Sequence, residues 1–223
     1  KLNYIKFISN IAVDEKYIIG REKYVNSAVL ISIVRMDDEE FILFQKRSKT
    51  VRQPGEVSFP GGHFELTKDK DFLFTAVRET CEELGISKQN ITILGKLGTL
   101  VAPMGVIVEA YIGVLNINSI EELEIDKKEV DRIFLIPLKY FLDNKPDEYY
   151  TSIEIHPFTI NERGDRIDHF PVKELGLPEK YSVPWKRGKH RVLVYITSEE
   201  VIWGITAELI FELSQKLKAE IDK

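Results

Sequence analysis

From Arg78 to Ile86 the chain reads Arg-Glu-Thr-Cys-Glu-Glu-Leu-Gly-Ile, and the sequence Phe-Pro-Gly-Gly stands upstream at residues 59–62. The spacing of apolar side chains predicts a helix from Asp71 to Leu84. Asp69 or Asp71 can cap the start of this helix, and Gly85 can end it. A glycine-bearing turn lets the backbone approach a ligand closely, so the turn and the helix together indicate a ligand site.

The predicted helix carries a cluster of carboxylates. Each helical residue advances about 100°, so Glu79, Glu82 and Glu83 share one face over little more than a turn. Arg78 precedes Glu82 at the spacing of a helical ion pair, and the like charges of Glu79 and Glu83 repel each other. Three clustered carboxylates suit a hard divalent cation such as Mg²⁺; a solvated acidic face is the alternative interpretation. The opposite, core-facing stripe is expected to contain Leu73, Val77, Thr80, Cys81 and Leu84.

Apolar runs on both sides of this helix predict strands, which indicates an α/β protein with one domain over residues 1–223. The runs at residues 24–36 and 41–46 flank a polar turn, which predicts a hairpin. Residues 47–70 are expected to form a loop. The other expected elements are a helix at 2–13, strands at 92–100, 106–115 and 132–136, a helical turn at 137–142, a C-terminal extension from about 143 with a hairpin turn at 162–165, and a last helix at about 199–221.

The composition is that of an ordinary globular protein, with 43% hydrophobic and 30% charged residues among 223. A chain this apolar is not disordered. The formal net charge of -5 argues against a primary role in binding nucleic acid, because such domains usually carry a basic surface. Cys81 is the only cysteine, which excludes an intrachain disulfide and a multi-cysteine zinc site and favours the cytoplasm. No apolar run is long enough to predict a membrane span.

The segment from Gly62 to Ile86 resembles the Nudix box, G-x5-E-x7-R-E-U-x-E-E-x-G-U, in which U is bulky and apolar. Its second half is matched by Arg78, Glu79, Glu82, Glu83, Gly85 and Ile86. Thr80 stands where an apolar residue is usual, and the spacing from Gly62 to Arg78 is two residues longer than in the common box. Lys68 occupies the position of the first glutamate, for which Asp69 or Glu65 can substitute.

This resemblance implies a Nudix-type α/β/α sandwich with a mixed central β-sheet, and a hydrolase that cuts the diphosphate linkage of a small nucleotide derivative. It implies that Glu79, Glu82 and Glu83 bind Mg²⁺ or Mn²⁺, which lower the pKa of the water that attacks phosphorus and stabilise the leaving oxygen. It also implies that Arg78 orients Glu82 or Glu65 by hydrogen bonding rather than taking part in the chemistry.

The segment before the box resembles the coenzyme A diphosphatase branch of that family. The matching residues are Arg47-Ser48, Val51-Arg52, Gly55, Val57 and Phe59-Pro60-Gly61-Gly62. This resemblance implies cleavage of coenzyme A or its thioesters to 4′-phosphopantetheine and adenosine 3′,5′-bisphosphate. Arg47 and Arg52 suit substrate phosphates because a guanidinium can bind phosphate oxygens through two hydrogen bonds; a surface ion pair is the alternative for Arg47. Gly61 and Gly62 are expected to border the substrate.

Several alternatives stay open. The substrate can instead be ADP-ribose, NADH, a dinucleoside polyphosphate or a damaged nucleotide, and a Nudix fold can also serve as a non-catalytic nucleotide sensor. Glu109 and Glu129 are each a candidate metal ligand or base, or an ordinary outward-facing or loop glutamate. His63 can contact phosphate or stabilise its loop, while Trp203 and Gly204 are expected to pack the last helix. Residues 143–198 can shape the far end of the pocket or an oligomer contact, with a homodimer as one option.

Overall fold

The structure is a computed structural model that describes residues 18–223, with the backbone alone at Arg187. The helix expected at residues 2–13 lies outside the described residues. No helix within the described part is both long and apolar enough to cross a membrane.

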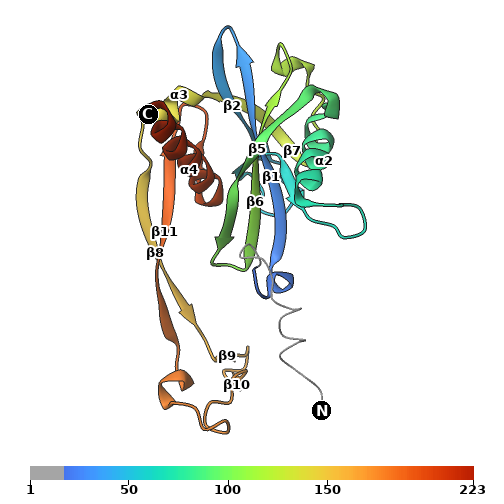
Figure 1. The fold of residues 1–223 in the computed structure, drawn as a ribbon. Coiled ribbons are helices and arrows are strands. Elements are labelled where there is room, and N and C mark those ends of the chain that lie inside the picture. The colour runs from blue at the N-terminus through green and yellow to red at the C-terminus, as the bar shows by residue number, and fades with distance from the viewer. Residues whose placement is uncertain (1–17) are drawn as a thin grey trace, which may run out of the picture.

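A mixed sheet of seven strands forms the centre of the molecule (Figure 1). Its path runs β3-β2-β1-β6-β5, with β4 paired to β1 and β7 paired to β2. The predicted hairpin is confirmed because β1 and β2 pair antiparallel, whereas β1 and β6 run parallel. The strands are β1 (Val25–Met36), β2 (Glu39–Arg47), β3 (Val57–Ser58), β4 (Gly61–His63), β5 (Ile91–Ala102), β6 (Val106–Leu115) and β7 (Val130–Pro137). The short strands β3 and β4 lie within the segment that was expected to be loop.

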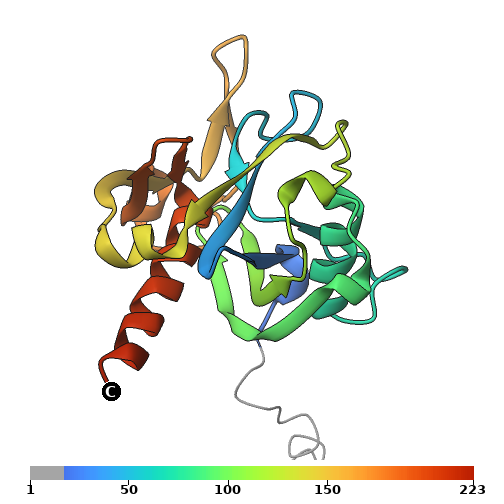
Figure 2. The same ribbon diagram turned by 90° about the horizontal axis from the view of Figure 1, so that it is seen from above.

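Helices cover both faces of this sheet, which confirms the predicted α/β/α architecture (Figures 1 and 2). The helices are α2 (Phe72–Leu84), α3 (Leu138–Asp143) and α4 (Gly204–Ile221), with 3-10 turns η1 (Arg21–Lys23), η2 (Lys88–Asn90), η3 (Ile120–Glu122) and η4 (Glu179–Ser182). Along β1, Leu30 packs in the apolar cluster under α2, and the next residue, Ile31, packs in the cluster under α4. The strand is apolar on both sides because both of its faces are covered.

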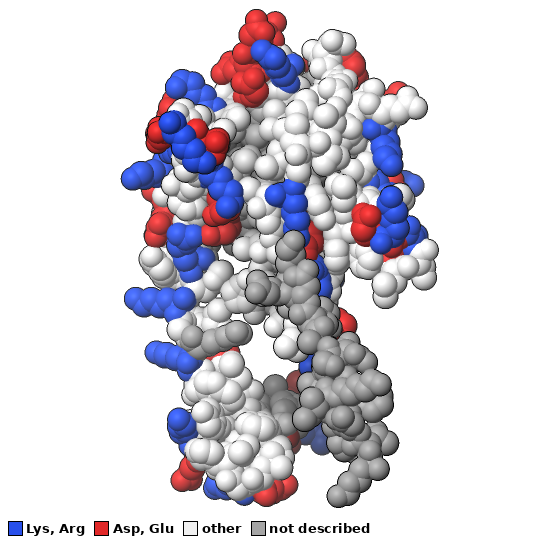
Figure 3. Space-filling view, in the orientation of Figure 1, with Lys and Arg blue, Asp and Glu red and all other residues white. Residues whose placement is uncertain are grey.

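The start and the end of α2 follow the sequence prediction. The side chain of Asp71 accepts a hydrogen bond from the backbone N–H of Phe74 at 2.7 Å, and Gly85 ends the helix with a positive φ of 63°. On the face of the molecule seen in Figure 3, acidic side chains gather at the β1–β2 turn, and basic side chains follow the ribbon of β8 (Asp147–Ile155) and β11 (Trp185–Ile196).

A second sheet of three strands lies beside the first, in the order β12-β11-β8. Strands β8 (Asp147–Ile155) and β11 (Trp185–Ile196) continue as a long ribbon that extends away from the central sheet (Figure 1). Near its far end, β9 (Phe158–Ile160) pairs with β10 (Arg166–Asp168) around the predicted hairpin turn. The third strand, β12 (Val201–Trp203), precedes α4 directly. Leu193, Tyr195 and Ile202 of this sheet are buried in the cluster under α4.

The last helix begins later than the sequence predicts. Residues Val201–Trp203 pair with β11 instead of joining a helix from Glu199, so α4 starts at Gly204. The reason is a long-range pairing, because these β-branched and aromatic side chains fit a pleated sheet. Trp203, which was expected to pack the last helix, lies on β12 directly before α4, and its side chain is about half exposed.

Candidate active site

Two glycines bring β4 into direct contact with β1 and α2. A β-carbon at Gly62 would lie 2.3 Å from Cδ of Glu79, and one at Gly61 would lie 2.3 Å from the carbonyl oxygen of Ala28. Real β-carbons do not approach other atoms so closely, so only glycine fits at either position. Both glycines were predicted to border the substrate, and the structure places Gly62 against the carboxylate of Glu79.

Glu83 is the most buried of the three glutamates, at 4% exposure. Its carboxylate accepts hydrogen bonds from the backbone N–H of Gly61 at 2.8 Å and from the side-chain amide of Gln45 at 2.9 Å. Burial raises the pKa of Glu83 to about 7, although both hydrogen bonds act in the opposite direction. Gln45 was not among the predicted site residues. The sequence feature that could have identified it is a polar side chain directly after the apolar run of strand β2.

Arg78 connects three acidic side chains of the helix and its preceding loop into one network. Its guanidinium contacts Asp69 at 2.8 and 3.1 Å, Glu79 at 2.9 Å and Glu82 at 2.9 Å. The hydrogen bond from Arg78 lowers the pKa of Asp69 to about 2. Glu65, the other candidate for the missing first glutamate, pairs with Lys68 instead. The structure therefore pairs Arg78 with Asp69.

The three predicted metal ligands are neighbours with different surroundings. Glu82 is 61% exposed, whereas Glu79 is mostly buried. Burial raises the pKa of Glu79, Arg78 opposes this effect, and the negative charges of Glu82 and Glu129 add to it. Arg78 holds two of the glutamates and β4 holds the third, so within residues 18–223 no three acidic, histidine or cysteine side chains converge on a common point.

The residues nevertheless fit a divalent cation in their chemistry. Mg²⁺ prefers oxygen ligands and is usually held by a few carboxylates together with substrate phosphates. Two carboxylates here, those of Glu79 and Glu83, have raised pKa values because burial leaves their negative charge poorly compensated. A cation would supply the missing positive charge.

The two predicted phosphate-binding arginines lie in residues 47–56, which we call the arginine loop: Arg47 ends β2, and Arg52 lies in the loop that follows it. The backbone of Arg47 bonds to Glu56 and Gly55, and its Nε donates to the carbonyl oxygen of Arg52 at 2.9 Å. Neither Arg47 nor Arg52 forms an ion pair with a carboxylate in the described part of the chain. Arg47 also lowers the pKa of Glu83 through its charge, which places it within electrostatic range of the buried glutamate.

A loop at residues 126–129 joins the arginine loop to the end of α2. The backbone N–H of Asp126 donates to the carbonyl oxygen of Glu83 at 2.9 Å. The backbone N–H of Ser48 donates to the carbonyl oxygen of Glu129, also at 2.9 Å. The hydroxyl of Thr50 adds a bond of 2.7 Å to Lys128. Segments that are far apart in sequence are thereby assembled around the glutamates, with Glu129 close enough to Glu79 to raise its pKa.

Two other candidates lie in different surroundings. Glu109 is buried on β6, where it pairs with Arg21 and with Lys96 at 2.5 Å and accepts a hydrogen bond from Thr99 at 2.7 Å. Its charge is compensated by protein groups, and it faces inward rather than outward. His63 is exposed, and its Nδ1 lies 3.1 Å from the hydroxyl of Ser27.

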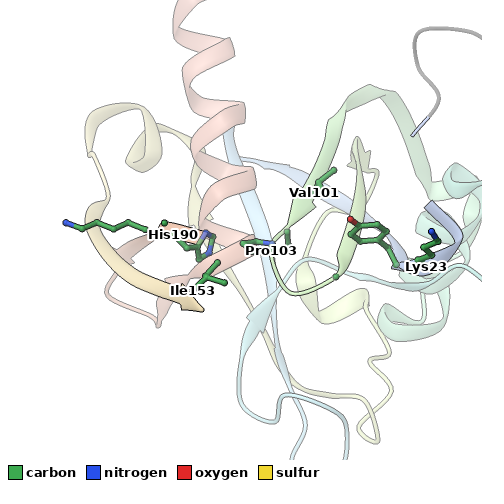
Figure 4. A pocket seen from close by; sticks show the side chains of 10 residues that line it. Lys23, Val101, Pro103, Ile153 and His190 are labelled. Carbon is green, nitrogen blue, oxygen red and sulfur yellow. The ribbon is translucent and has the colours of Figure 1, made fainter. Parts of the chain in front are cut away.

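A separate cleft of about 550 Å³ lies between the central sheet and the ribbon (Figure 4). Ile153 and His190 come from the ribbon, while Val101 and Pro103 come from β5 and the turn after it. None of its lining residues belongs to α2, to β4 or to the arginine loop. The ribbon therefore shapes a cleft whose residues are distinct from those of the glutamate site.

The chain is similar to known proteins. A model of the NUDIX domain matches residues 25–154. An uncharacterized Nudix hydrolase, NudL, of Photorhabdus laumondii is 29% identical over 194 residues, covering 86% of this chain and 85% of that protein. The peroxisomal coenzyme A diphosphatase NUDT7 of Mus musculus is 34% identical over 198 residues, covering 87% of this chain and 74% of that protein. A crystal structure of an Ap4A hydrolase binary complex of C. elegans aligns with a TM-score of 0.44 and 22% identity, covering 53% of this chain and 84% of that one.

The matched family region contains the central sheet, α2 and the whole glutamate network. This chain therefore belongs to the Nudix hydrolase family, and it is a pyrophosphohydrolase.

Proposed function

We propose that this enzyme hydrolyses the diphosphate linkage of coenzyme A or its thioesters, releasing 4′-phosphopantetheine and adenosine 3′,5′-bisphosphate. The observation that carries the proposal is the loop with Arg47 and Arg52, tied to the glutamate helix by the 126–129 loop and without carboxylate partners among residues 18–223. Its sequence resembles that of coenzyme A diphosphatases. The likeness to the mouse protein of that name supports the same substrate.

The glutamates supply the acidic side of the site. Glu79, Glu82 and Glu83 would hold Mg²⁺ or Mn²⁺, with Glu129 as a further carboxylate beside Glu79. When bound, the cation supplies charge neutralisation at the diphosphate and a water of lowered pKa. The raised pKa values of Glu79 and Glu83 support this role, because both side chains lack a full complement of positive charge.

The arginines position the glutamates or bind the substrate. Arg78, fixed by Asp69, holds Glu79 and Glu82 in position and does not itself contact substrate. Arg47 and Arg52 bind the phosphate groups of the substrate through their guanidinium N–H donors. Glu129, which lies near Glu79 and is not one of the three glutamates assigned to the cation, is the candidate for the base.

One substrate panel tests the proposal. Coenzyme A, dephospho-coenzyme A, ADP-ribose, NADH and a dinucleoside tetraphosphate are each incubated with the enzyme and Mg²⁺, and the products are identified by mass. We expect the two named products from coenzyme A, and a kcat/KM at least about 10-fold above that for ADP-ribose or NADH, which is about 1.4 kcal/mol of transition-state stabilisation.

The variant Glu83→Gln, purified in the same way, shows whether this enzyme or a contaminating one causes the turnover. A higher efficiency on ADP-ribose or NADH would assign the enzyme to that substrate instead. Equal efficiency on all substrates, or turnover that Glu83→Gln leaves unchanged, would also contradict the proposal.

A further inference from the structure

Gln45 is a polar side chain without exposed surface on the side of the central sheet that α2 covers. It follows Ile42, Leu43 and Phe44 on β2, which are fully buried as well. Leu43 packs in the apolar cluster under α2, and Gln45, two residues further along the strand, projects to the same side of the sheet. An amide in such surroundings costs free energy unless its hydrogen bonds are complete. Packing alone therefore does not account for a glutamine at this position.

The side chain of Gln45 reaches the glutamate site through a hydrogen bond. Its Nε2 donates to Oε1 of Glu83 at 2.9 Å, while the backbone N–H of Gly61 donates to Oε2 of the same carboxylate at 2.8 Å. Each carboxylate oxygen of Glu83 thus has one donor, and the two donors come from different strands, β2 and β4. A carboxylate held at both oxygens has a fixed orientation, and each oxygen keeps a lone pair for a further ligand.

The oxygen of the Gln45 amide shows that this arrangement is not optimal for stability. Within residues 18–223, Oε1 of Gln45 is buried without a hydrogen-bond partner, and so is Oγ of Ser58. Ser58 is the residue directly opposite Gln45 in the β2–β3 pair, so both side chains project to the same side of the sheet. A buried polar atom without a partner destabilises the folded state, and an apolar side chain of similar volume would avoid this cost. The glutamine is thus better explained by its contact with Glu83 than by stability.

We propose that Gln45 is a positioning residue, which fixes the carboxylate of Glu83 in the orientation that binds the divalent cation. The inference rests on the proposed role of Glu83 as a ligand of that cation. An uncharged amide suits this task, because it orients the carboxylate and leaves its negative charge available to a metal ion. The guanidinium of Arg78, in contrast, neutralises part of the charge of Glu79. Hydrogen-bond partners of metal ligands typically account for about 10- to 100-fold in metal affinity.

Titration of the full chain with Mn²⁺ alone, followed by the electron paramagnetic resonance signal of the free ion, tests the inference. Gln45→Met keeps the approximate volume of the side chain and removes the donor. We expect its dissociation constant for Mn²⁺ to rise about 10- to 100-fold. Its melting temperature without metal should hold or rise, because the variant no longer buries an incompletely bonded amide. Gln45→Leu is a second apolar replacement and should behave in the same way.

The matched control is Ser32→Ala on the neighbouring strand β1. Ser32 is also fully buried, and it lies opposite Leu43, so it projects to the same side of the sheet as Gln45. Its hydroxyl donates to the carbonyl oxygen of Leu30 at 3.3 Å and contacts none of the site glutamates. The variant removes a buried polar group without touching Glu83, so it should bind Mn²⁺ as the wild type does.

Glu83→Gln in the same titration separates this inference from the proposed function. If Glu83→Gln binds Mn²⁺ as tightly as the wild type, the assignment of Glu83 to the cation fails, and the positioning role fails with it. If Glu83→Gln weakens binding but both apolar variants of Gln45 bind normally, only the positioning role is overturned. A clear fall in the melting temperature of both Gln45 variants would also overturn it, because the amide would then serve stability. Equal loss of affinity in Ser32→Ala would have the same consequence.

Discussion

The guanidinium of Arg78 and the carboxylate of Asp69 form a doubly bonded ion pair, with Nε–Oδ1 at 2.8 Å and Nη2–Oδ2 at 3.1 Å. The pair links the loop before α2 to the middle of the helix. Asp69 occupies one side of the Arg78 guanidinium. On the other side, Nη2 contacts Glu79 and Nη1 contacts Glu82. The geometry of the glutamate site thus depends on a carboxylate that lies outside the helix.

Asp69→Asn should impair both stability and activity. The change removes the charge that pairs with a mostly buried guanidinium, which should lower the free energy of unfolding by about 1–3 kcal/mol. It also frees Arg78 to shift, and we expect kcat/KM to fall about 10- to 100-fold, as for other groups that orient metal ligands. Urea unfolding and steady-state kinetics measure the two effects. Glu65→Gln is the control and should resemble the wild type, because the side chain of Glu65 pairs with Lys68 at the surface, while its backbone N–H, which donates to Asp69, is unchanged. Equal losses in both variants would contradict the assignment.

Glu83→Gln should separate activity from stability. The amide keeps an oxygen for the N–H of Gly61 but removes a negative charge from a buried position, so the melting temperature should hold or rise. Metal-dependent turnover should fall about 100- to 1,000-fold, a loss typical for removal of a group that stabilises transition-state charge. Calorimetry and product assays over a range of Mg²⁺ concentrations check this. Glu212→Gln on the exposed side of α4 serves as the control, and full activity of Glu83→Gln would refute the metal assignment.

Alanine at the two glycines of β4 should have different effects. Gly62→Ala displaces the Glu79 carboxylate, a side chain that can move, so kcat/KM should drop about 10- to 100-fold with little loss of stability. Gly61→Ala meets the backbone of β1, which cannot move freely, so the unfolding free energy should fall by about 1–3 kcal/mol. Gly98→Ala, whose added carbon meets open space, is the control. Unfolding and kinetics on all three variants test whether the two effects separate in this way.

Removing either arginine of the loop should weaken substrate binding more than chemistry. Arg47→Ala and Arg52→Ala should each raise KM about 10-fold with kcat within about 3-fold, because a phosphate contact made in both ground and transition states contributes uniform binding. Initial rates with coenzyme A give both constants. Arg35→Ala, at an exposed site on β1, should leave KM unchanged. A fall in kcat with KM unchanged would instead assign these side chains to the chemical step.

The buried Glu109 should make stability depend on acid pH. Burial raises its pKa, but hydrogen bonds from Lys96, Thr99 and Arg21 outweigh burial and leave the pKa below its ordinary value of 4.5. The folded state therefore binds fewer protons than the unfolded state, and this stabilisation is present above pH 4.5 and disappears as the pH falls through the folded pKa.

Urea unfolding of Glu109→Gln and wild type between about pH 3 and 7 checks this. The variant should be less stable by about 1–3 kcal/mol at neutral pH, and the difference should shrink toward zero in acid. Glu40→Gln, which removes an exposed carboxylate on β2, should follow the wild type throughout. A difference that grows on acidification would contradict the stated direction of the shift.

Local sequence patterns were sufficient for the central hairpin and for the helix that carries the glutamates. The hairpin of β1 and β2 follows from two apolar runs around a polar turn, and α2 follows from its apolar spacing, its Asp71 cap and Gly85. These features depend on neighbours within a few residues, which is the range that propensity and capping describe. The spacing of the glutamates, and with it the family resemblance, is of the same local kind.

The contacts that complete the site depended on long-range pairing. Sequence alone left Asp69 and Glu65 as candidates for the missing first glutamate of the box, did not place Gln45 beside Glu83, and extended the last helix over β12. In each case the outcome rests on which strand lies beside which, and no local pattern encodes that arrangement. The chain by itself determined a helix with three glutamates and the chemistry they suit. Only packing of β4, β2 and two distant loops against that helix buried Glu83 and set its pKa, because burial is a property of the assembled tertiary structure.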